Sequence, residues 1–131
     1  FVLIATTNQP CVARGDVRRN EVDLMHTVLR RKLPLHDLFL CCSDDSSHPC
    51  YKPNPGMFLE AAFKWNLDLD RSFVISDKWP DAKAAQVAGC TSILIRSPWI
   101  GTDHHDFVVE DLTEAVRKVQ HLGVSPACVL A

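Results

Sequence analysis

The sequence predicts an α/β fold in which helices cover both faces of a parallel sheet, as three α/β/α layers. Short segments that are apolar throughout alternate with segments of helical periodicity, and prolines and glycines separate them. Continuously apolar strands are typical of a sheet that is buried on both faces. Strands that alternate with helices favour right-handed crossovers between parallel strands. A length of 131 residues suffices for one such domain with its own core.

Each short apolar run is predicted to form one strand. These predicted strands are residues 1–6, 38–42, 73–76, 92–96 and 107–109. The predicted helices are residues 18–33, 55–65, 80–87 and 111–123. Prolines end the first helix and open the next two, and Gly89 suits a helix C-terminus. Residues 43–55 are predicted to be a polar loop and residues 125–131 a loose tail, so the domain spans residues 1–124.

Composition excludes several classes of protein. Lys+Arg 14 against Asp+Glu 16 leaves no basic surplus that would suggest a nucleic-acid partner. No apolar run is long enough to span a bilayer, and no basic segment of a secretory signal is present. The six cysteines are therefore expected to be reduced thiols of a cytoplasmic protein. Because the chain begins at Phe1 within an apolar run and its first methionine is Met25, we expect an N-terminally incomplete fragment.

Polar side chains follow the predicted strands at their carboxyl ends, where ligand sites lie in folds of this kind. Thr7 and Asn8 follow the first strand and can donate hydrogen bonds to an anion. Asp77 and Asp81 straddle a strand-to-helix turn, where carboxylate oxygens suit Mg²⁺. Lys52 lies in a proline-stiffened loop before a helix start, from which its charge can reach a phosphate oxygen.

Each of these residues also has a purely structural interpretation. Threonine and asparagine favour turns, Asp81 suits a helix N-terminus by its charge, and a single lysine is most often solvated. Only Asp77, at the tip of a buried strand, favours a functional role by its position alone.

In their order along the chain, these segments resemble the haloacid dehalogenase (HAD) superfamily of phosphohydrolases. The likeness lies in TN at residues 7–8, KPNPGM at residues 52–57 and SDKWPD at residues 76–81. TNQPCVARG at residues 7–15 is similar to the TNQSGIARG stretch of the branch that contains histidinol-phosphatase and heptose bisphosphate phosphatase. The resemblance covers residues 1–97 and implies the Rossmann-like HAD core.

The resemblance implies a Mg²⁺-dependent phosphatase that works through an aspartyl-phosphate intermediate. Thr7 would hold the transferring phosphoryl group with Asn8 beside it, and Lys52 would neutralise phosphate charge and steady the nucleophile. Asp77 would bind Mg²⁺, and Asp81 would support the ion. Such a centre works by stabilising charge around the metal and the phosphate.

Two further basic residues, Arg14 and Lys78, would contact substrate or stabilise loops in a member of this family. The implied partner is a small phosphorylated metabolite, either a sugar phosphate or histidinol phosphate. No nucleic-acid or membrane partner is expected, and the expected state is a monomer.

The departures from the family pattern concern the nucleophile and substrate recognition. The family's D-x-D aspartates lie on a strand before the strand that ends in Thr7, and nothing precedes Phe1, so we expect the chain as printed to be inactive and the intact protein to be a phosphatase. Ser76 replaces a glycine, and Tyr51 replaces an arginine that recognises substrate phosphate in this branch. A non-catalytic binding domain, or pseudophosphatase, is the alternative.

Cysteine and histidine side chains gather in the loop before Lys52. The resembling branch often carries a structural zinc site there, and Zn²⁺ takes four Cys or His ligands in a tetrahedron. The candidate zinc ligands are Cys41, Cys42, His48 and Cys50, although neighbours on a strand point to opposite faces. The alternative is two buried strand cysteines with an unrelated surface histidine. A small metal-binding interaction module built on this loop is a third hypothesis.

Overall fold

A parallel sheet forms the middle layer of the molecule. The computed structural model describes residues 1–123 and the backbone of residues 127–130. The strands are β1 (Val2–Asn8), β2 (Asp37–Cys41), β3 (Ser72–Ser76), β4 (Thr91–Ile95), β5 (Phe107–Val109) and β6 (Ala127–Leu130). The helices are α1 (Pro10–Ala13), α2 (Arg19–Lys32), α3 (Gly56–Trp65), α4 (Trp79–Ala88) and α5 (Leu112–Leu122), with a 3-10 turn η1 (Leu69–Arg71).

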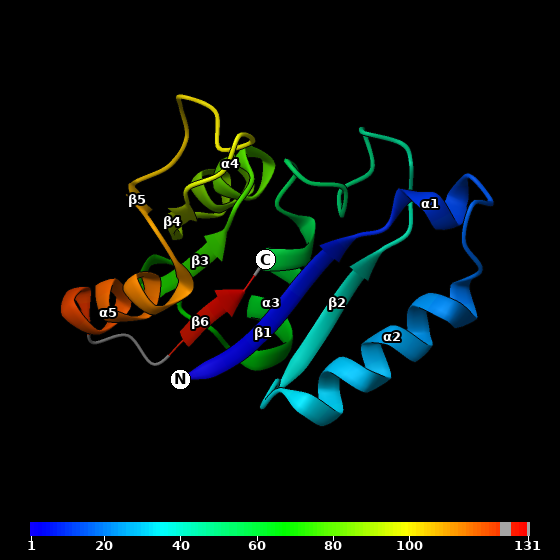
Figure 1. Ribbon diagram of the computed structural model, residues 1–131, viewed down its shortest axis with the longest axis horizontal. Coiled ribbons are helices and arrows are strands. Elements are labelled where there is room, and N and C mark those ends of the chain that lie inside the picture. Colours follow the sequence, from blue (N-terminus) through cyan, green and yellow to red (C-terminus); the bar gives the residue numbers. More distant parts are fainter. Residues whose placement is uncertain (124–126, 131) are drawn as a thin grey trace.

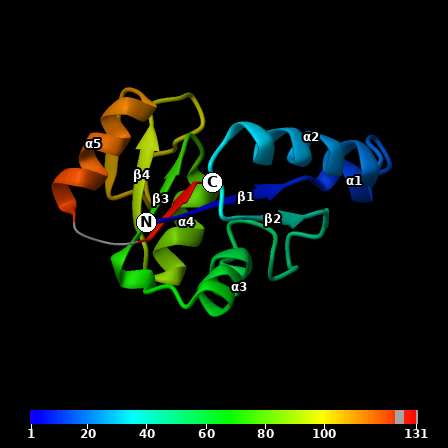
Figure 2. The same ribbon diagram turned by 90° about the horizontal axis from the view of Figure 1, so that it is seen from below.

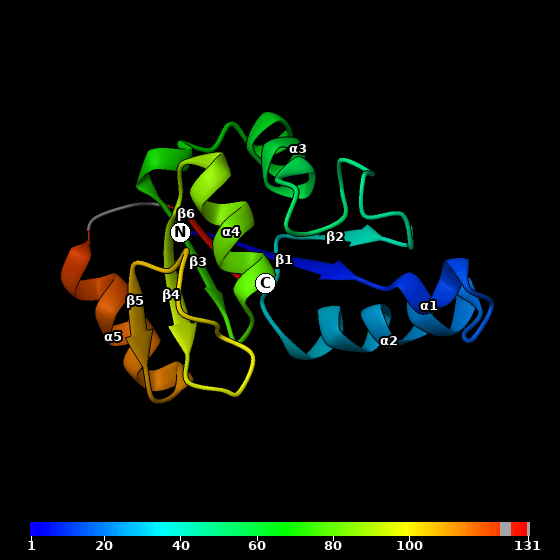
Figure 3. The same ribbon diagram turned by 90° about the horizontal axis from the view of Figure 1, so that it is seen from above.

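The strands pair in the order β2-β1-β6-β3-β4-β5, and every pairing is parallel (Figure 1). Helices α3 and α4 lie on one face of this twisted sheet, and α2 and α5 lie on the other (Figures 2 and 3). The prediction of a three-layer α/β/α fold is therefore confirmed. Because the strands are parallel, the loops that follow β1, β2 and β3 leave the same edge of the sheet.

Alternating side chains of β3 divide the core between the two faces. Phe73 and Ile75 pack with Ile93 and the apolar face of α5. Val74 points the other way and packs with Phe58 of α3 and the alanines of α4. The central strand is thus fully buried, as its continuously apolar sequence predicts.

The predicted elements agree with the observed ones to within two residues at each end. Gly89 ends α4 in the left-handed conformation, at φ 88°. The Asp111 carboxylate caps α5 by accepting a hydrogen bond from the Glu114 N–H at 2.8 Å. Helix α1 and the turn η1 were not predicted, because a single helical turn is too short to show a period.

The predicted loose tail is wrong for residues 127–130, which form β6 between β1 and β3 (Figure 1). Leu130 lies opposite Ala5 on one side and Ile75 on the other. A strand here pairs two rows of backbone N–H and C=O groups that would otherwise be unsatisfied at the sheet centre. Residues 125, 126 and 131 of the predicted tail lie outside the described residues.

Helix α2 has the predicted amphipathic pattern, yet most of its apolar face is not buried. Val22 is buried, whereas Met25, Val28, Leu29 and Leu33 are each more than 40% exposed. No helix in the described part of the chain is long and apolar enough to cross a bilayer.

Asp37, at the start of β2, is a buried carboxylate with cations beside it. Lys64 Nζ lies 2.6 Å and Arg30 lies 3.5 Å from its oxygens, and the Trp65 indole donates a hydrogen bond at 2.8 Å. Burial alone would raise the pKa of Asp37. Hydrogen bonds from Lys64, Trp65 and the Leu38 N–H, with the Lys64 charge, outweigh burial and lower this pKa to about 2.

We expect Asp37 to make the stability of the fold depend on acid pH. Its folded-state pKa lies below the ordinary value of 3.8, so its stabilisation is complete above about pH 5 and is lost as the pH falls through the folded-state pKa. Its cations are half-exposed and screened by water, so the expected loss is about 1–2 kcal/mol. Urea unfolding over this pH range should give a flatter stability curve for Asp37→Asn than for the wild type, and parallel curves would contradict the prediction.

Candidate active site

The loops after β1, β2 and β3 surround a hollow of about 530 Å³ at the carboxyl edge of the sheet. A volume of this size is typical of small-molecule sites. Its lining comes from three segments that are far apart in sequence, around residues 6–10, 51–53 and 76–81. The predicted site residues that line it are Thr7, Asn8, Lys52, Asp77, Lys78 and Asp81.

Lys52 lies at the bottom of the hollow in a buried polar network. Its side chain is 8% exposed, and its ammonium forms an ion pair with Asp81, which is 7% exposed. The same ammonium donates to Thr6, at 3.3 Å to the carbonyl oxygen and 3.4 Å to Oγ1. Ser76 Oγ donates to the other Asp81 oxygen at 2.6 Å. Burying one charge without the other is costly, so this pair fixes β1, the loop before α3 and α4 relative to one another.

Thr7 and Asn8 reach the hollow from the end of β1. Gln9 Nε2 donates to Thr7 Oγ1 at 3.1 Å, which leaves the Thr7 hydroxyl hydrogen free to donate to an anion. The Asn8 side chain bonds the backbone of Lys52 twice, with N–H to Oδ1 at 3.3 Å and Nδ2 to the carbonyl at 3.4 Å. Asn8 therefore holds the lysine loop against β1.

Asp77 follows β3 directly and is the exposed carboxylate of the hollow. Lys78 comes next and is also exposed, and its N–H donates to Ser76 Oγ at 3.3 Å. Helix α4 starts one residue later, so its positive end points at the hollow and favours an anion there. The site thus combines one free carboxylate, two lysines and a helix N-terminus.

The structure does not bring Arg14 into this site. Its guanidinium pairs with Asp16 at 3.3 Å on an exposed turn, and Arg14 is not among the residues that line the hollow. In this conformation Arg14 pairs within its own turn, and the expectation that it contacts substrate or stabilises a loop stays a prediction. Arg14 is exposed and lies directly before Gly15, which has φ 80°.

Comparison with known proteins identifies the family. A family model described as HAD-hydrolase-like matches residues 49–115. The D-glycero-beta-D-manno-heptose-1,7-bisphosphate 7-phosphatase of Vibrio cholerae is 37% identical over 135 residues, which cover 92% of this chain and 73% of that protein. This chain belongs to the HAD-like hydrolase family. A protein of the same name from Rhodopseudomonas palustris is 32% identical over 130 residues, covering 89% of this chain and 70% of its own.

Solved structures agree with this assignment. The D,D-heptose 1,7-bisphosphate phosphatase from B. bronchiseptica, crystallised with magnesium and phosphate, superposes with a TM-score of 0.82 at 25% identity. The superposition covers 93% of this chain and 75% of that one. The resemblance drawn from the segments at residues 7–8, 52–57 and 76–81 is confirmed at the level of the family.

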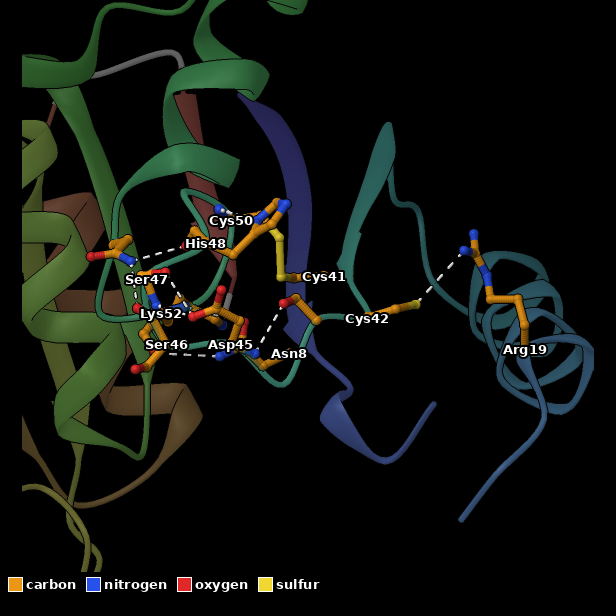
Figure 4. The surroundings of a disulfide bond; sticks show 12 residues. Asn8, Arg19, Cys41, Cys42, Asp45, Ser46, Ser47, His48, Cys50 and Lys52 are labelled. Carbon is orange, nitrogen blue, oxygen red and sulfur yellow. Dashed lines mark hydrogen bonds between the residues drawn. A yellow bond between two sulfur atoms is a disulfide. The ribbon is translucent and has the colours of Figure 1, made fainter. Parts of the chain in front are cut away.

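The cysteine loop of this HAD-like chain differs from the prediction in its oxidation state. Cys41 and Cys50 form a disulfide, so the expectation of reduced thiols is wrong for this pair (Figure 4). Their Cα atoms lie 5.6 Å apart, which is the distance a disulfide needs. The spacing of cysteines in sequence does not show that a loop of this length folds back so closely.

The candidate zinc ligands are only partly gathered. Ligand atoms of Cys41, His48 and Cys50 lie within 4.8 Å of one another. Cys42 points to the opposite side of β2, where Arg19 donates to its sulfur at 3.7 Å (Figure 4). Side chains of adjacent strand residues point to opposite faces, so Cys42 cannot join Cys41, His48 and Cys50 as a zinc ligand in this conformation.

Sequence reasoning missed several functional neighbours in this HAD-like site. Thr6 contacts Lys52 although the motif threonine is Thr7, and Ser76 holds the Asp81 carboxylate. Trp79 also lines the hollow, at the first residue of α4. The only signal for Thr6 and Ser76 is their position at strand ends, which is weak without a partner in view.

Proposed function

We propose that this chain carries the phosphate-binding and metal-binding part of a Mg²⁺-dependent phosphatase that acts on a small phosphorylated sugar. The observation that carries the proposal is the convergence of Thr7, Lys52 and Asp77 on one hollow from separate segments. Hydroxyl, ammonium and carboxylate groups in this arrangement suit a phosphoryl group and a cation.

Of the two carboxylates predicted to bind Mg²⁺, one is available to hold the ion. Asp77 is exposed to the hollow, whereas both oxygens of Asp81 are engaged by Lys52 and Ser76. Mg²⁺ commonly takes one or two carboxylates and completes its shell with water and substrate oxygens, so Asp77 would hold the ion and Asp81 would support the site through Lys52. When bound, the ion would supply charge to a phosphoryl oxygen.

The chain's own residues would act on the phosphoryl group by orienting it and neutralising its charge. Thr7 would donate its hydroxyl hydrogen to one phosphoryl oxygen, and the Lys52 ammonium would offset negative charge from the floor. Asp77 and Asp81 are already committed to the cation and to Lys52, so neither is free to attack phosphorus. In the family the attacking carboxylate is one of the D-x-D aspartates, and covalent turnover therefore needs a carboxylate beyond these residues.

Relatives favour a sugar phosphate over histidinol phosphate, because those named above are heptose bisphosphate phosphatases. The same names favour an enzyme over a non-catalytic binding domain. A heptose bisphosphate is our proposed substrate class. That the protein is a monomer and lies in the cytoplasm stays a prediction.

Zn²⁺ is proposed only for the reduced loop. With the Cys41–Cys50 disulfide closed, both sulfur ligands are taken up by the S–S bond, and His48 Nδ1 accepts a hydrogen bond from the Cys50 N–H at 3.2 Å. Reduction would release two thiolates beside it, a partial zinc set.

We expect the purified 131-residue chain to bind inorganic phosphate in the presence of Mg²⁺ without hydrolysing sugar phosphates. Isothermal titration with phosphate, with and without Mg²⁺, measures the first part, and a phosphate-release assay measures the second. Asp77→Asn should remove the Mg²⁺ dependence of binding. Metal-dependent release of phosphate by this chain would show that the nucleophile has been misassigned, and absence of phosphate binding would overturn the proposed function.

A further inference from the structure

Two exposed tryptophans stand beside the phosphate hollow. Trp79 is 43% exposed and Trp99 is 59% exposed, which is unusual for the largest apolar side chains. A second hollow of about 550 Å³ lies between them and is lined by Asp77, Lys78, Trp79, Pro80 and Trp99. All of these except Trp99 also line the phosphate hollow, so the two hollows are adjacent.

The loop that carries Trp99 is tied to the turn that carries Asp77. The Trp79 N–H donates to the Trp99 carbonyl at 2.9 Å. Ser97 Oγ donates to the Asp77 carbonyl and accepts a hydrogen bond from the Trp99 N–H at 3.1 Å. These bonds hold the backbone of the two tryptophans and of the proposed metal ligand in one unit.

Packing also orients the Trp79 ring. Gly101 has φ 67°, and a Cβ at this position would lie 3.3 Å from Trp79 Cβ, so the loop passes close to the side chain. The His104 ring lies 6.4 Å from the Trp79 ring, at an interplanar angle of 41°. His104 Nδ1 is in turn 3.1 Å from Gln86 Oε1 of α4. Trp79 is thus supported by the loop, while its side chain stays 43% exposed and lines both hollows.

We propose that Trp79 and Trp99 form a subsite for the carbon skeleton of the substrate, and that the class of ligand it takes is a sugar ring. The inference rests on the proposed function, because the phosphate hollow would hold the phosphoryl end. An indole face carries negative partial charge, and the C–H face of a sugar ring presents positive edges to it. The sugar hydroxyls would then point away from the rings toward water and the exposed Lys78.

Because the two hollows are adjacent and share four residues, they favour a ligand that bears a phosphate at one end. A ligand anchored by its phosphate next to Lys52 would have its next atoms over Asp77 and Lys78, two of the four residues common to both spaces. Trp79 is also one of the shared residues, and Trp99 lines only the second space. A nucleoside monophosphate could also stack on an indole, and this alternative is an outcome of the experiment below.

The test compares the dissociation constants of inorganic phosphate, a heptose or hexose phosphate and a nucleoside monophosphate by isothermal titration with Mg²⁺. In Trp99→Ala we expect sugar phosphate to bind about five- to tenfold more weakly, with inorganic phosphate unchanged, because Trp99 does not line the phosphate hollow. Trp79 lines both hollows, so for Trp79→Ala the readout is the ratio of sugar-phosphate to phosphate affinity, which should fall. Trp99→Phe should recover most of the loss. Phe63→Ala is the matched control, since Phe63 is an aromatic residue that is 92% exposed and lines neither hollow.

The outcomes separate the two proposals. If inorganic phosphate fails to bind the wild type, the proposed function fails and the subsite falls with it. If phosphate binds but both alanine variants keep the wild-type ratio of sugar-phosphate to phosphate affinity, the subsite alone is refuted. A nucleoside monophosphate that binds more tightly than sugar phosphate, with the same dependence on tryptophan, would also refute the assigned ligand class. Thermal unfolding of each variant establishes that it is folded, and the exposed Trp99 keeps the test valid if Trp79→Ala is unstable.

Discussion

Replacing Lys52 by methionine is expected to weaken phosphate binding about 10- to 100-fold and to lower the free energy of unfolding by about 3–5 kcal/mol. Binding weakens because the ammonium at the bottom of the hollow is lost. Stability falls because Asp81, which is 7% exposed, keeps a buried charge without its partner. Isothermal titration with phosphate and urea unfolding measure the two effects separately.

The double variant Lys52→Met, Asp81→Asn is the control for the first prediction. Removing both charges should restore most of the stability, because no uncompensated ion remains buried. Phosphate binding should not recover, because it depends on the lysine. A double variant that binds phosphate as tightly as the wild type would show that Lys52 has only a structural role.

Removing the Cys41–Cys50 disulfide is expected to lower the free energy of unfolding by about 2–3 kcal/mol. The bond closes a loop with a sequence separation of 9 residues, and its loss gives the unfolded chain more freedom. The loop runs directly into Tyr51 and Lys52, so phosphate affinity should fall as well. Urea unfolding of Cys41→Ser, Cys50→Ser against wild type, both without reductant, measures the change.

Cys42→Ser is the matched control for the disulfide, since Cys42 is a free thiol next to Cys41 and lies on the opposite side of β2. It should leave stability unchanged. In the wild type, a reductant should also allow Zn²⁺ to bind at Cys41, His48 and Cys50. The double variant Cys41→Ser, Cys50→Ser has lost two of these ligands and should not bind Zn²⁺ under the same conditions. Equal stability of wild type and the double serine variant would contradict the assigned bond.

Local sequence signals predict the elements of this fold because each depends on neighbouring residues. The apolar run before Ser76 and the helix start after Lys78 lie within one short segment, so both are visible in the sequence. The register of β1 on β2, which sets Thr7 beside Leu40, follows from the burial of alternate side chains. Family motifs then indicate that the three loops share a site.

Partners that are distant in sequence could not be predicted in this way. The ion pair of Lys52 with Asp81 and the contact of Lys52 with Thr6 join segments separated by 29 and 46 residues. The sequence offers many other acidic and hydroxyl side chains with which a lysine could pair equally well. β6 was missed because a short apolar run after a helix fits a tail as well as a strand. Its role in the sheet depends on the space between β1 and β3, which only the assembled fold defines.

Backbone amide NMR during titration with inorganic phosphate and Mg²⁺ tests most directly whether three separate segments bind one phosphoryl group. We expect the amide signals of Thr7, Lys52 and Asp77 to shift together, with one common dissociation constant, and those of α2 to stay unchanged. Shifts confined to the basic end of α2 at Arg30, Arg31 and Lys32, with the three loops unaffected, would contradict the proposed site.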